Sequence, residues 1–296
     1  MTLAEGAWLR WGPCLEGPLI GDGKRGCGAG PETARKHARH RGTLAPYVAV
    51  MKKHAHRFPP DIPQSLLIDL TAGPGRYRDA AGVEYTGTGL IALEAFDRAQ
   101  LRSVAVLFER VEPFAEHLKQ LIGNRPEPKL GQSVVVRGDA WDCADQTLVA
   151  VTRRVPWLDT RTPFGLISLD CNGGPDLEAL DALLRRWPKL LQYVDVWVHL
   201  PAGIMKLIRV VHGRGLLRDR VLALPKTVWK IRPSDGDRLG WVELVGTNWD
   251  DAPTWRAQGF LDLRSAEGQA ALDAETLTRS ERRARESGRQ LGLALP

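Results

Sequence analysis

The sequence predicts an α/β fold built on a mostly parallel sheet, and three observations support that prediction. Helical stretches such as Pro113–Ile122 and Leu177–Trp187 alternate with apolar runs of strand length, the pattern of βαβ units. The first of these runs leads directly into a glycine-rich turn, Asp69 to Gly75. Each later run ends in a polar residue. We therefore expect a Rossmann-like sheet with helices on both faces. The expected strands lie near residues 65–70, 103–109, 133–137, 165–170 and 193–199.

The C-terminal half of the sheet is expected to close with a hairpin. The runs Thr227–Ile231 and Gly240–Thr247 are joined by a turn-rich segment, residues 233–237. One of these two strands should lie antiparallel to the rest.

The chain divides into three expected parts. Residues 1–57 contain a glycine- and proline-rich arm and a helix over about 32–57. Residues 58–250 form the sheet domain, and residues 251–296 form a C-terminal extension with an Arg-rich tail. A chain of 296 residues that is 43% hydrophobic can bury one large core.

The glycine turn indicates a nucleotide-like cofactor, because Gly73 and Gly75 allow main-chain N–H groups to approach a ligand closely. The dinucleotide fingerprint needs a third glycine where this chain has Arg78, which makes a nicotinamide-dependent oxidoreductase improbable. S-adenosylmethionine fits better, since Asp69 can lie beside its cationic sulfonium. Thr71 belongs to the same expected cofactor loop. The alternative is a turn that only closes a strand-helix connection.

Polar groups follow three more strands. Glu109 is the candidate for the ribose hydroxyls, and Asp139, with Ala140 after it, for the adenine amine. Asp170 and Asn172 follow the fourth strand. Ligands bind beyond the carboxyl ends of strands in open α/β sheets, so these residues together favour a cofactor site. Taken singly, each carboxylate can instead be a helix N-cap or a solvated loop residue.

These segments resemble the three-Cys-motif partner proteins, a family with a methyltransferase-like domain found in bacteria and on mobile elements. The resemblance covers about residues 30 to 250. It implies a Rossmann-like methyltransferase sheet, a phage or mobile-element origin and a possible protein partner. Cys171 stands where the family has a proline, and the Asp-Pro-Pro-Tyr signature of amino-methyltransferases is absent. The matching segments are Leu67–Arg76, Gly87–Leu93, Phe108–Glu109, Gly138–Ala140, Leu169–Gly173 and Val198–Pro201.

The expected function is that of an S-adenosylmethionine-dependent methyltransferase acting on nucleic acid or a nucleotide-derived base. Asp170 and Asn172 are the candidates for orienting the acceptor, and His199 is a candidate general base. His199 can equally be a core histidine. No metal is expected. The rival hypothesis is a non-catalytic nucleic-acid-binding partner protein that keeps the fold.

A net charge of +6 points to an anionic partner such as nucleic acid. One basic cluster, Arg35–Arg41, is expected to project from a helix anchored by Leu44, Tyr47, Val48 and Met51. A second lies in the tail between Arg279 and Arg289. Trp141 is a candidate for stacking on a base.

The four cysteines form no Cys-x-x-Cys pair, which favours a reducing cytoplasm over a disulfide framework. A metal site of Cys14 and Cys27 with His37 and His40 is an unusual alternative, because its spacing matches no common finger. No apolar run reaches the roughly 18 residues that span a bilayer, so no membrane contact is expected.

Overall fold

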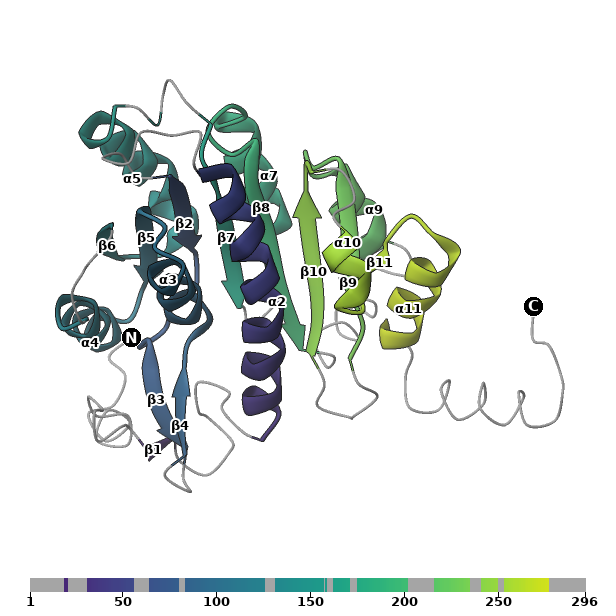
Figure 1. The fold of residues 1–296 in the computed structure, drawn as a ribbon, viewed down its shortest axis with the longest axis horizontal. Coiled ribbons are helices and arrows are strands. Elements are labelled where there is room, and N and C mark those ends of the chain that lie inside the picture. Colours follow the sequence, from purple (N-terminus) through teal and green to yellow (C-terminus); the bar gives the residue numbers. More distant parts are fainter. Residues whose placement is uncertain are drawn as a thin grey trace, which may run out of the picture.

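The computed structural model shows an α/β fold with one large sheet (Figure 1). It describes residues 19–20, 31–55, 64–79, 83–125, 131–156, 158, 162–170, 175–201, 216–234, 241–249 and 253–276. The main strands are β2 (Ser65–Asp69), β5 (Ser103–Glu109), β6 (Gln132–Arg137), β7 (Phe164–Asp170), β8 (Tyr193–Pro201), β9 (Val228–Arg232), β10 (Trp241–Thr247) and β11 (Leu261–Asp262). The five predicted parallel strands and the predicted hairpin are all present, within one or two residues of the expected ends.

The strand order is β11-β9-β10-β8-β7-β2-β5-β6. β2, β5, β6, β7 and β8 pair in parallel, whereas β10 is antiparallel to both β8 and β9. The predicted α/β sheet, mostly parallel with a C-terminal antiparallel hairpin, is confirmed. The central strands β2 and β5 are buried at every position, as continuous apolar runs between two helical layers should be.

Helices cover both faces of the sheet, as predicted (Figure 1). α2 (Pro31–Ala55), α3 (Thr88–Arg98), α4 (Glu112–Gly123) and α10 (Pro253–Ala257) lie on one face, around a core that contains Phe96 and Trp197. α5 (Ala140–Arg154), α7 (Leu177–Arg186), α9 (Leu216–Ala223) and α11 (Ala266–Thr276) lie on the other, around a core that contains Phe108 and Trp229.

A second sheet has three strands, two of which lie in the sequence between the glycine turn and α3. It consists of β1 (Leu19–Ile20), β3 (Arg76–Asp79) and β4 (Glu84–Thr86), with β1 parallel to β3 and β3 antiparallel to β4. Within the described residues, β3 begins directly after Gly75 and pairs antiparallel with β4 before α3 begins. The two-residue strand β1 belongs to the N-terminal stretch that the sequence predicts to be a glycine- and proline-rich arm.

α2 confirms its predicted apolar anchor, because Leu44, Tyr47, Val48 and Met51 are all buried. The prediction that the basic run projects from this anchor is wrong for three residues. Lys36, His37 and His40 are 4% exposed or less, because their side chains face the sheet. The second basic cluster, Arg279 to Arg289, lies outside the described residues. Among the helices in the described ranges, none combines the length and apolar character needed to cross a membrane.

Candidate cofactor and acceptor site

The glycine turn after β2 has the backbone geometry that only glycine adopts readily. Gly73 has φ +61° and Gly75 has φ +80°, both in the left-handed region. A Cβ on Gly75 would lie 2.7 Å from a methyl carbon of Leu118 on α4. The Gly75 carbonyl accepts a hydrogen bond from the Gly87 N–H at 2.6 Å, which closes the turn onto the start of α3. The turn is thus a compact corner at the carboxyl edge of the sheet, with no Cβ at Gly73 or Gly75.

Asp69 is the last residue of β2 and is fully buried beneath this turn. Its Oδ1 accepts a hydrogen bond from the Thr71 N–H at 2.9 Å. A Cβ on Gly89 would lie only 1.9 Å from Oδ2, so the first turn of α3 packs directly on the carboxylate. The carboxylate therefore ties the turn to α3.

Burial raises the pKa of Asp69 to about 7, and the negative charges of Asp170 and Glu109 add to the rise. The main-chain N–H groups of Thr71 and Gly89 oppose it. A carboxyl group with this pKa is partly protonated near neutral pH. A cation placed beside it would favour the charged form.

Glu109 ends β5, the strand next to β2, and is 8% exposed. Its Oε1 accepts a hydrogen bond from the Val111 N–H at 2.7 Å. Burial raises the pKa of Glu109, and hydrogen bonds from the N–H groups of Val111 and Gly73 lower it. The structure thus places Asp69 and Glu109 at the ends of adjacent strands around the glycine turn, and the charge of Glu109 helps to raise the pKa of Asp69.

Asp139 begins α5 after β6, with Ala140 as the first helical residue. Its Oδ1 accepts a hydrogen bond from the Trp141 N–H at 3.0 Å, so Asp139 serves as the helix N-cap. Trp141 is partly buried and packs against the core. The preceding Gly138 N–H donates to the Glu109 carbonyl at 3.1 Å, which brings this strand end beside that of β5.

Asp170 ends β7 on the other side of β2. Its N–H donates to the Thr71 hydroxyl at 2.7 Å, so Thr71 joins the ends of the two strands. Its Oδ2 accepts a hydrogen bond from Lys36 Nζ of α2 at 2.5 Å. Lys36 also lies 3.9 Å above the Trp241 ring. Asn172 and Cys171 lie outside the described residues.

His199 lies on β8, paired in register with Asp170 on β7 and Glu243 on β10. It is fully buried, and its ring centre is 4.9 Å from that of His40 on α2. Burial and the nearby charge of Lys36 hold the pKa of His199 well below its usual value. Both ring nitrogens lack a hydrogen-bond partner within the described ranges. His199 is thus a neutral, buried imidazole.

A layer of buried polar groups between α2 and the sheet escaped the sequence interpretation. Arg232 donates to the Thr43 hydroxyl at 2.8 Å and to Glu243 Oε1 at 2.7 Å. Arg232 and Glu243 are charged residues within apolar strands, which was one available signal. The other is a helical spacing on α2: Lys36, His40, Thr43 and Tyr47 follow one another at intervals of four, three and four residues.

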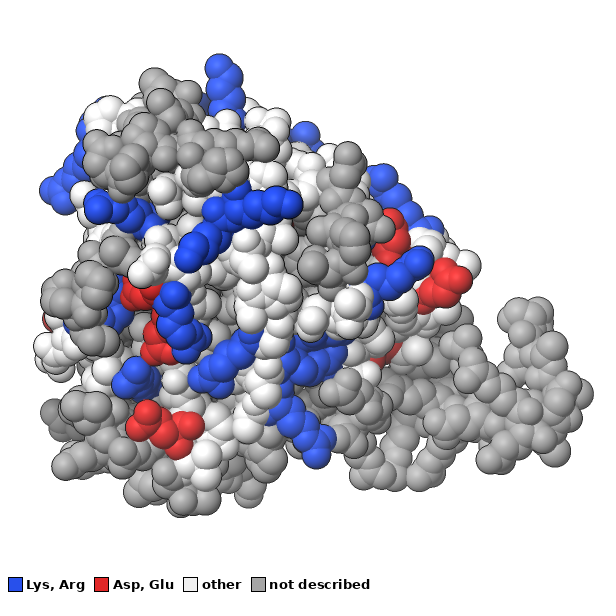
Figure 2. All heavy atoms as spheres, viewed as in Figure 1, with Lys and Arg blue, Asp and Glu red and all other residues white. Residues whose placement is uncertain are grey.

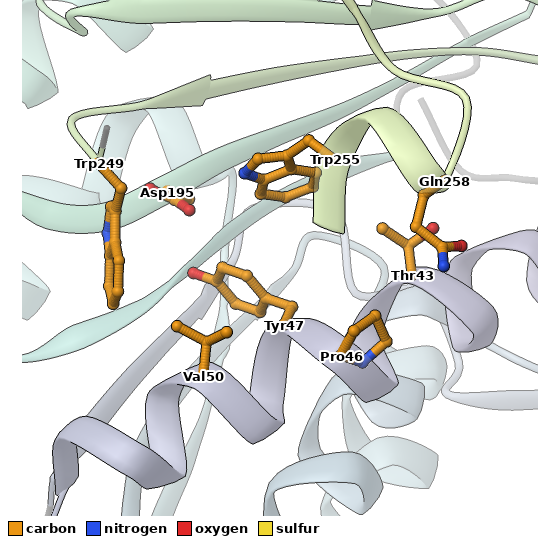
Figure 3. A pocket seen from close by; sticks show the side chains of 8 residues that line it. All are labelled: Thr43, Pro46, Tyr47, Val50, Asp195, Trp249, Trp255 and Gln258. Atoms are coloured by element: carbon orange, nitrogen blue, oxygen red, sulfur yellow. The ribbon is translucent and has the colours of Figure 1, made fainter. Parts of the chain in front are cut away.

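A small hollow at the opposite edge of the sheet is lined by Tyr47, Asp195, Trp249 and Trp255 among others (Figure 3). Its volume of about 20 Å³ admits roughly one water molecule. Burial raises the pKa of Asp195 to about 7. The Tyr47 hydroxyl donates to the Gly165 carbonyl at 2.5 Å, near the start of β7. The hollow is too small for a cofactor and lies away from the glycine turn.

Comparison with known proteins found no matching family model and no matching curated protein. A Legionella pneumophila protein matches with a TM-score of 0.46 and 12% identity, over 80% of this chain and 90% of that one. A human methyltransferase 10 domain containing protein matches with a TM-score of 0.42 and 12% identity, over 72% of this chain and 84% of that one. A putative rRNA-methylase from Clostridium thermocellum matches with a TM-score of 0.41 and 6% identity, over 74% and 98%. At TM-scores below 0.5 and identities of 12% or less, these similarities do not indicate the activity of this protein.

Proposed function

We propose that this chain is an S-adenosylmethionine-dependent methyltransferase of the three-Cys-motif partner family that acts on nucleic acid or a nucleotide-derived base. One observation supports this proposal above all. Two buried carboxylates, Asp69 and Glu109, lie at the ends of adjacent parallel strands around a left-handed glycine turn. That edge of an open α/β sheet is where ligands bind.

The residues fit the chemistry of the cofactor. Neither Gly73 nor Gly75 carries a Cβ, so the backbone of the turn can lie close to a ligand at these two positions. Glu109 is the proposed partner of the ribose hydroxyls, and Asp139 and Ala140 are proposed to contact the adenine. Asp69 supplies negative charge near the place of the sulfonium, whose bound methyl group is already activated for transfer.

The acceptor is proposed to meet Asp170, Asn172 and His199 at the next strand ends. Transfer to a nucleophile requires mainly positioning of the acceptor and exclusion of water. The ion pair with Lys36 fixes the Asp170 carboxylate in one place. His199 is neutral, but a pKa well below 6.5 makes it a weak proton acceptor, so the proposed transfer depends on positioning of the acceptor and not on strong base catalysis.

Isothermal titration calorimetry with S-adenosylmethionine and its demethylated product tests cofactor binding. We expect wild-type protein to bind both, and Glu109→Gln to weaken binding about tenfold, the effect of losing a charge-assisted hydrogen bond. Glu112→Gln is the matched control, because Glu112 is an exposed residue three positions away that pairs with Arg137. Absence of binding by the wild-type protein would overturn the proposal. Transfer of a labelled methyl group to DNA, RNA or protein then identifies the acceptor class.

The second candidate is a non-catalytic nucleic-acid-binding partner protein with the same fold. Two features favour it: Cys171 replaces the proline of the family pattern, and Lys36 already occupies the Asp170 carboxylate. Tight cofactor binding without transfer to any of the three acceptor classes would select this candidate. The nicotinamide alternative is tested by fluorescence titration with NADH, for which no binding is expected. We propose a cytoplasmic location and a phage or mobile-element origin for either candidate.

A further inference from the structure

An open groove runs between α2 and α3 on the outer surface of the molecule, with a volume of about 280 Å³. It exists because small residues line it: Ala45 and Ala49 on α2, Ala95 on α3, and Ala99 directly after α3. Packed helices with larger side chains at these positions would fill such a space. The two helices α2 and α3 therefore form the two sides of the groove.

Three cations line this groove and no carboxylate does. They are Arg41 and Lys52 of α2 and Arg98 of α3, and all three side chains are exposed. Within the described ranges, none of the three forms an ion pair. The two acidic residues of α3 are already neutralised, since Glu94 pairs with Arg76 at 3.0 Å and Asp97 pairs with Arg125 at 2.7 Å.

The surface around the groove is positive as well. Figure 2 shows the face that α2 and α3 present to solvent, where the blue side chains of Lys and Arg predominate over the middle of the view. Arg41 and Lys52 are eleven residues apart on α2, which separates their Cα atoms by about 16 Å along the helix. The cations are thus spread along the groove and not gathered at one point.

We infer that this groove binds a single strand of nucleic acid, with Arg41, Lys52 and Arg98 contacting successive phosphates. This inference rests on the proposed function, and it gives the nucleic-acid partner a location different from the basic run, of which only Arg41 is shared. Phosphate contacts position a strand without reading its sequence.

The shape and the lining favour this occupant. The groove between the two neighbouring helices has a volume of about 280 Å³, which is too small for a duplex. The lining alanines leave no deep pocket for the large apolar side chains by which a peptide helix docks. The floor, which includes Val48 and Ile91, offers aliphatic contact to sugars and base faces without aromatic stacking. Charge therefore carries the recognition, and binding should be independent of sequence and sensitive to salt.

The test is fluorescence anisotropy with a short labelled oligouridylate and the matching oligodeoxythymidylate. The variant Arg41→Gln/Lys52→Gln/Arg98→Gln removes three charges. The control Arg153→Gln/Arg154→Gln/Lys189→Gln removes three exposed charges on the α5–α7 side. We expect the groove variant to bind about tenfold more weakly or worse at about 50 mM salt, and its salt slope to fall by about two units. The control variant should keep wild-type affinity within about twofold.

Three outcomes would overturn the inference: no binding of either strand by the wild-type protein, equal loss in both variants, or displacement of the strand by an equal charge concentration of polyglutamate. The last outcome would indicate an acidic protein partner. Titration of the same groove variant with S-adenosylmethionine separates the two proposals, because Arg41, Lys52 and Arg98 lie outside the cofactor site. Loss of strand binding with cofactor binding retained supports the groove. A failure of cofactor binding in wild-type protein counts against the methyltransferase alone.

Discussion

Lys36 of α2 and Asp170 at the end of β7 are 134 positions apart in the sequence and form an ion pair of 2.5 Å, shielded by the Trp241 ring. The pair brings a buried ammonium group to the carboxylate that the proposed acceptor meets. It also fastens the N-terminal helix to the carboxyl edge of the sheet.

Replacing Lys36 with methionine should destabilise the protein by about 3 kcal/mol, because it leaves the Asp170 carboxylate without its partner in a mostly buried site. Urea unfolding followed by circular dichroism measures the change. Lys53→Met, an exposed position on the same helix, should change the stability by less than about 0.5 kcal/mol. In Lys36→Met/Asp170→Asn, part of the loss should return, and a further loss in this double variant would contradict the ion-pair explanation.

The buried histidines predict a loss of stability in acid. Burial lowers the pKa of His40 and His199 well below 6.5, and that of His37 to about 3. Such groups stabilise the fold above the unfolded pKa of 6.5, and this contribution disappears as the pH falls towards the folded pKa. Each histidine should cost about 1.4 kcal/mol per pH unit below 6.5. His40→Phe should reduce the slope of unfolding free energy against pH between pH 6 and 5 by about that amount. An unchanged slope would refute the assignment.

Asp69 should have the opposite effect on the pH dependence of stability, lowering the free energy of unfolding as the pH rises. Its pKa is raised to about 7 in the folded state, so its contribution is fully present below the unfolded value of 3.8 and is lost as the pH rises through 7. Asp69→Asn cannot ionise. The free energy of unfolding of this variant, relative to wild type, should therefore rise by roughly 3 to 4 kcal/mol between pH 4 and pH 8. Thermal or urea unfolding at both pH values measures it, and a constant difference would show that Asp69 titrates normally.

Gly89→Ala should disrupt the site, because its Cβ would lie 1.9 Å from Asp69 Oδ2. Either α3 or the carboxylate must move, so we expect a loss of a few kcal/mol and weakened binding of S-adenosylmethionine. Gly42→Ala provides the control: nothing lies within 4 Å of its Cβ, and its place in α2 predicts a gain of about 0.5–1 kcal/mol. Equal melting temperatures for wild type and Gly89→Ala would contradict the packing described here.

The sequence predicted the strand ends well because a parallel sheet brings them to one edge whatever the loops do. Asp69, Glu109, Asp139 and Asp170 follow apolar runs, and the order of the strands fixes their relative places. Lys36 was different. Its hydrophilic neighbours Arg35, Arg39 and Arg41 gave the appearance of a solvated cluster, and only the long-range position of Asp170 explains why it is buried.

His40 and Arg232 illustrate the same limit. Each has a partner on another element, His199 and Glu243 respectively, and local sequence carries no record of which strand a helix will cover. At Asp139 the sequence allowed a helix N-cap or a solvated loop carboxylate as alternatives to a cofactor contact. The side chain forms the N-cap by accepting a hydrogen bond from the Trp141 N–H, and this depends on a side-chain rotamer that the sequence does not determine.

α2 is attached to a single strand at two points, through Lys36 to Asp170 and through Tyr47 to Gly165. The attachment points are eleven residues apart on the helix and five apart on β7, and both intervals correspond to about 16 Å. The distance between the two contacts is therefore about the same along the helix and along the strand, and the two elements run in opposite directions. A shift of α2 by one residue along β7 would break both hydrogen bonds together. The two contacts therefore fix the register of α2 on β7, and we expect the helix to detach from the sheet as one unit.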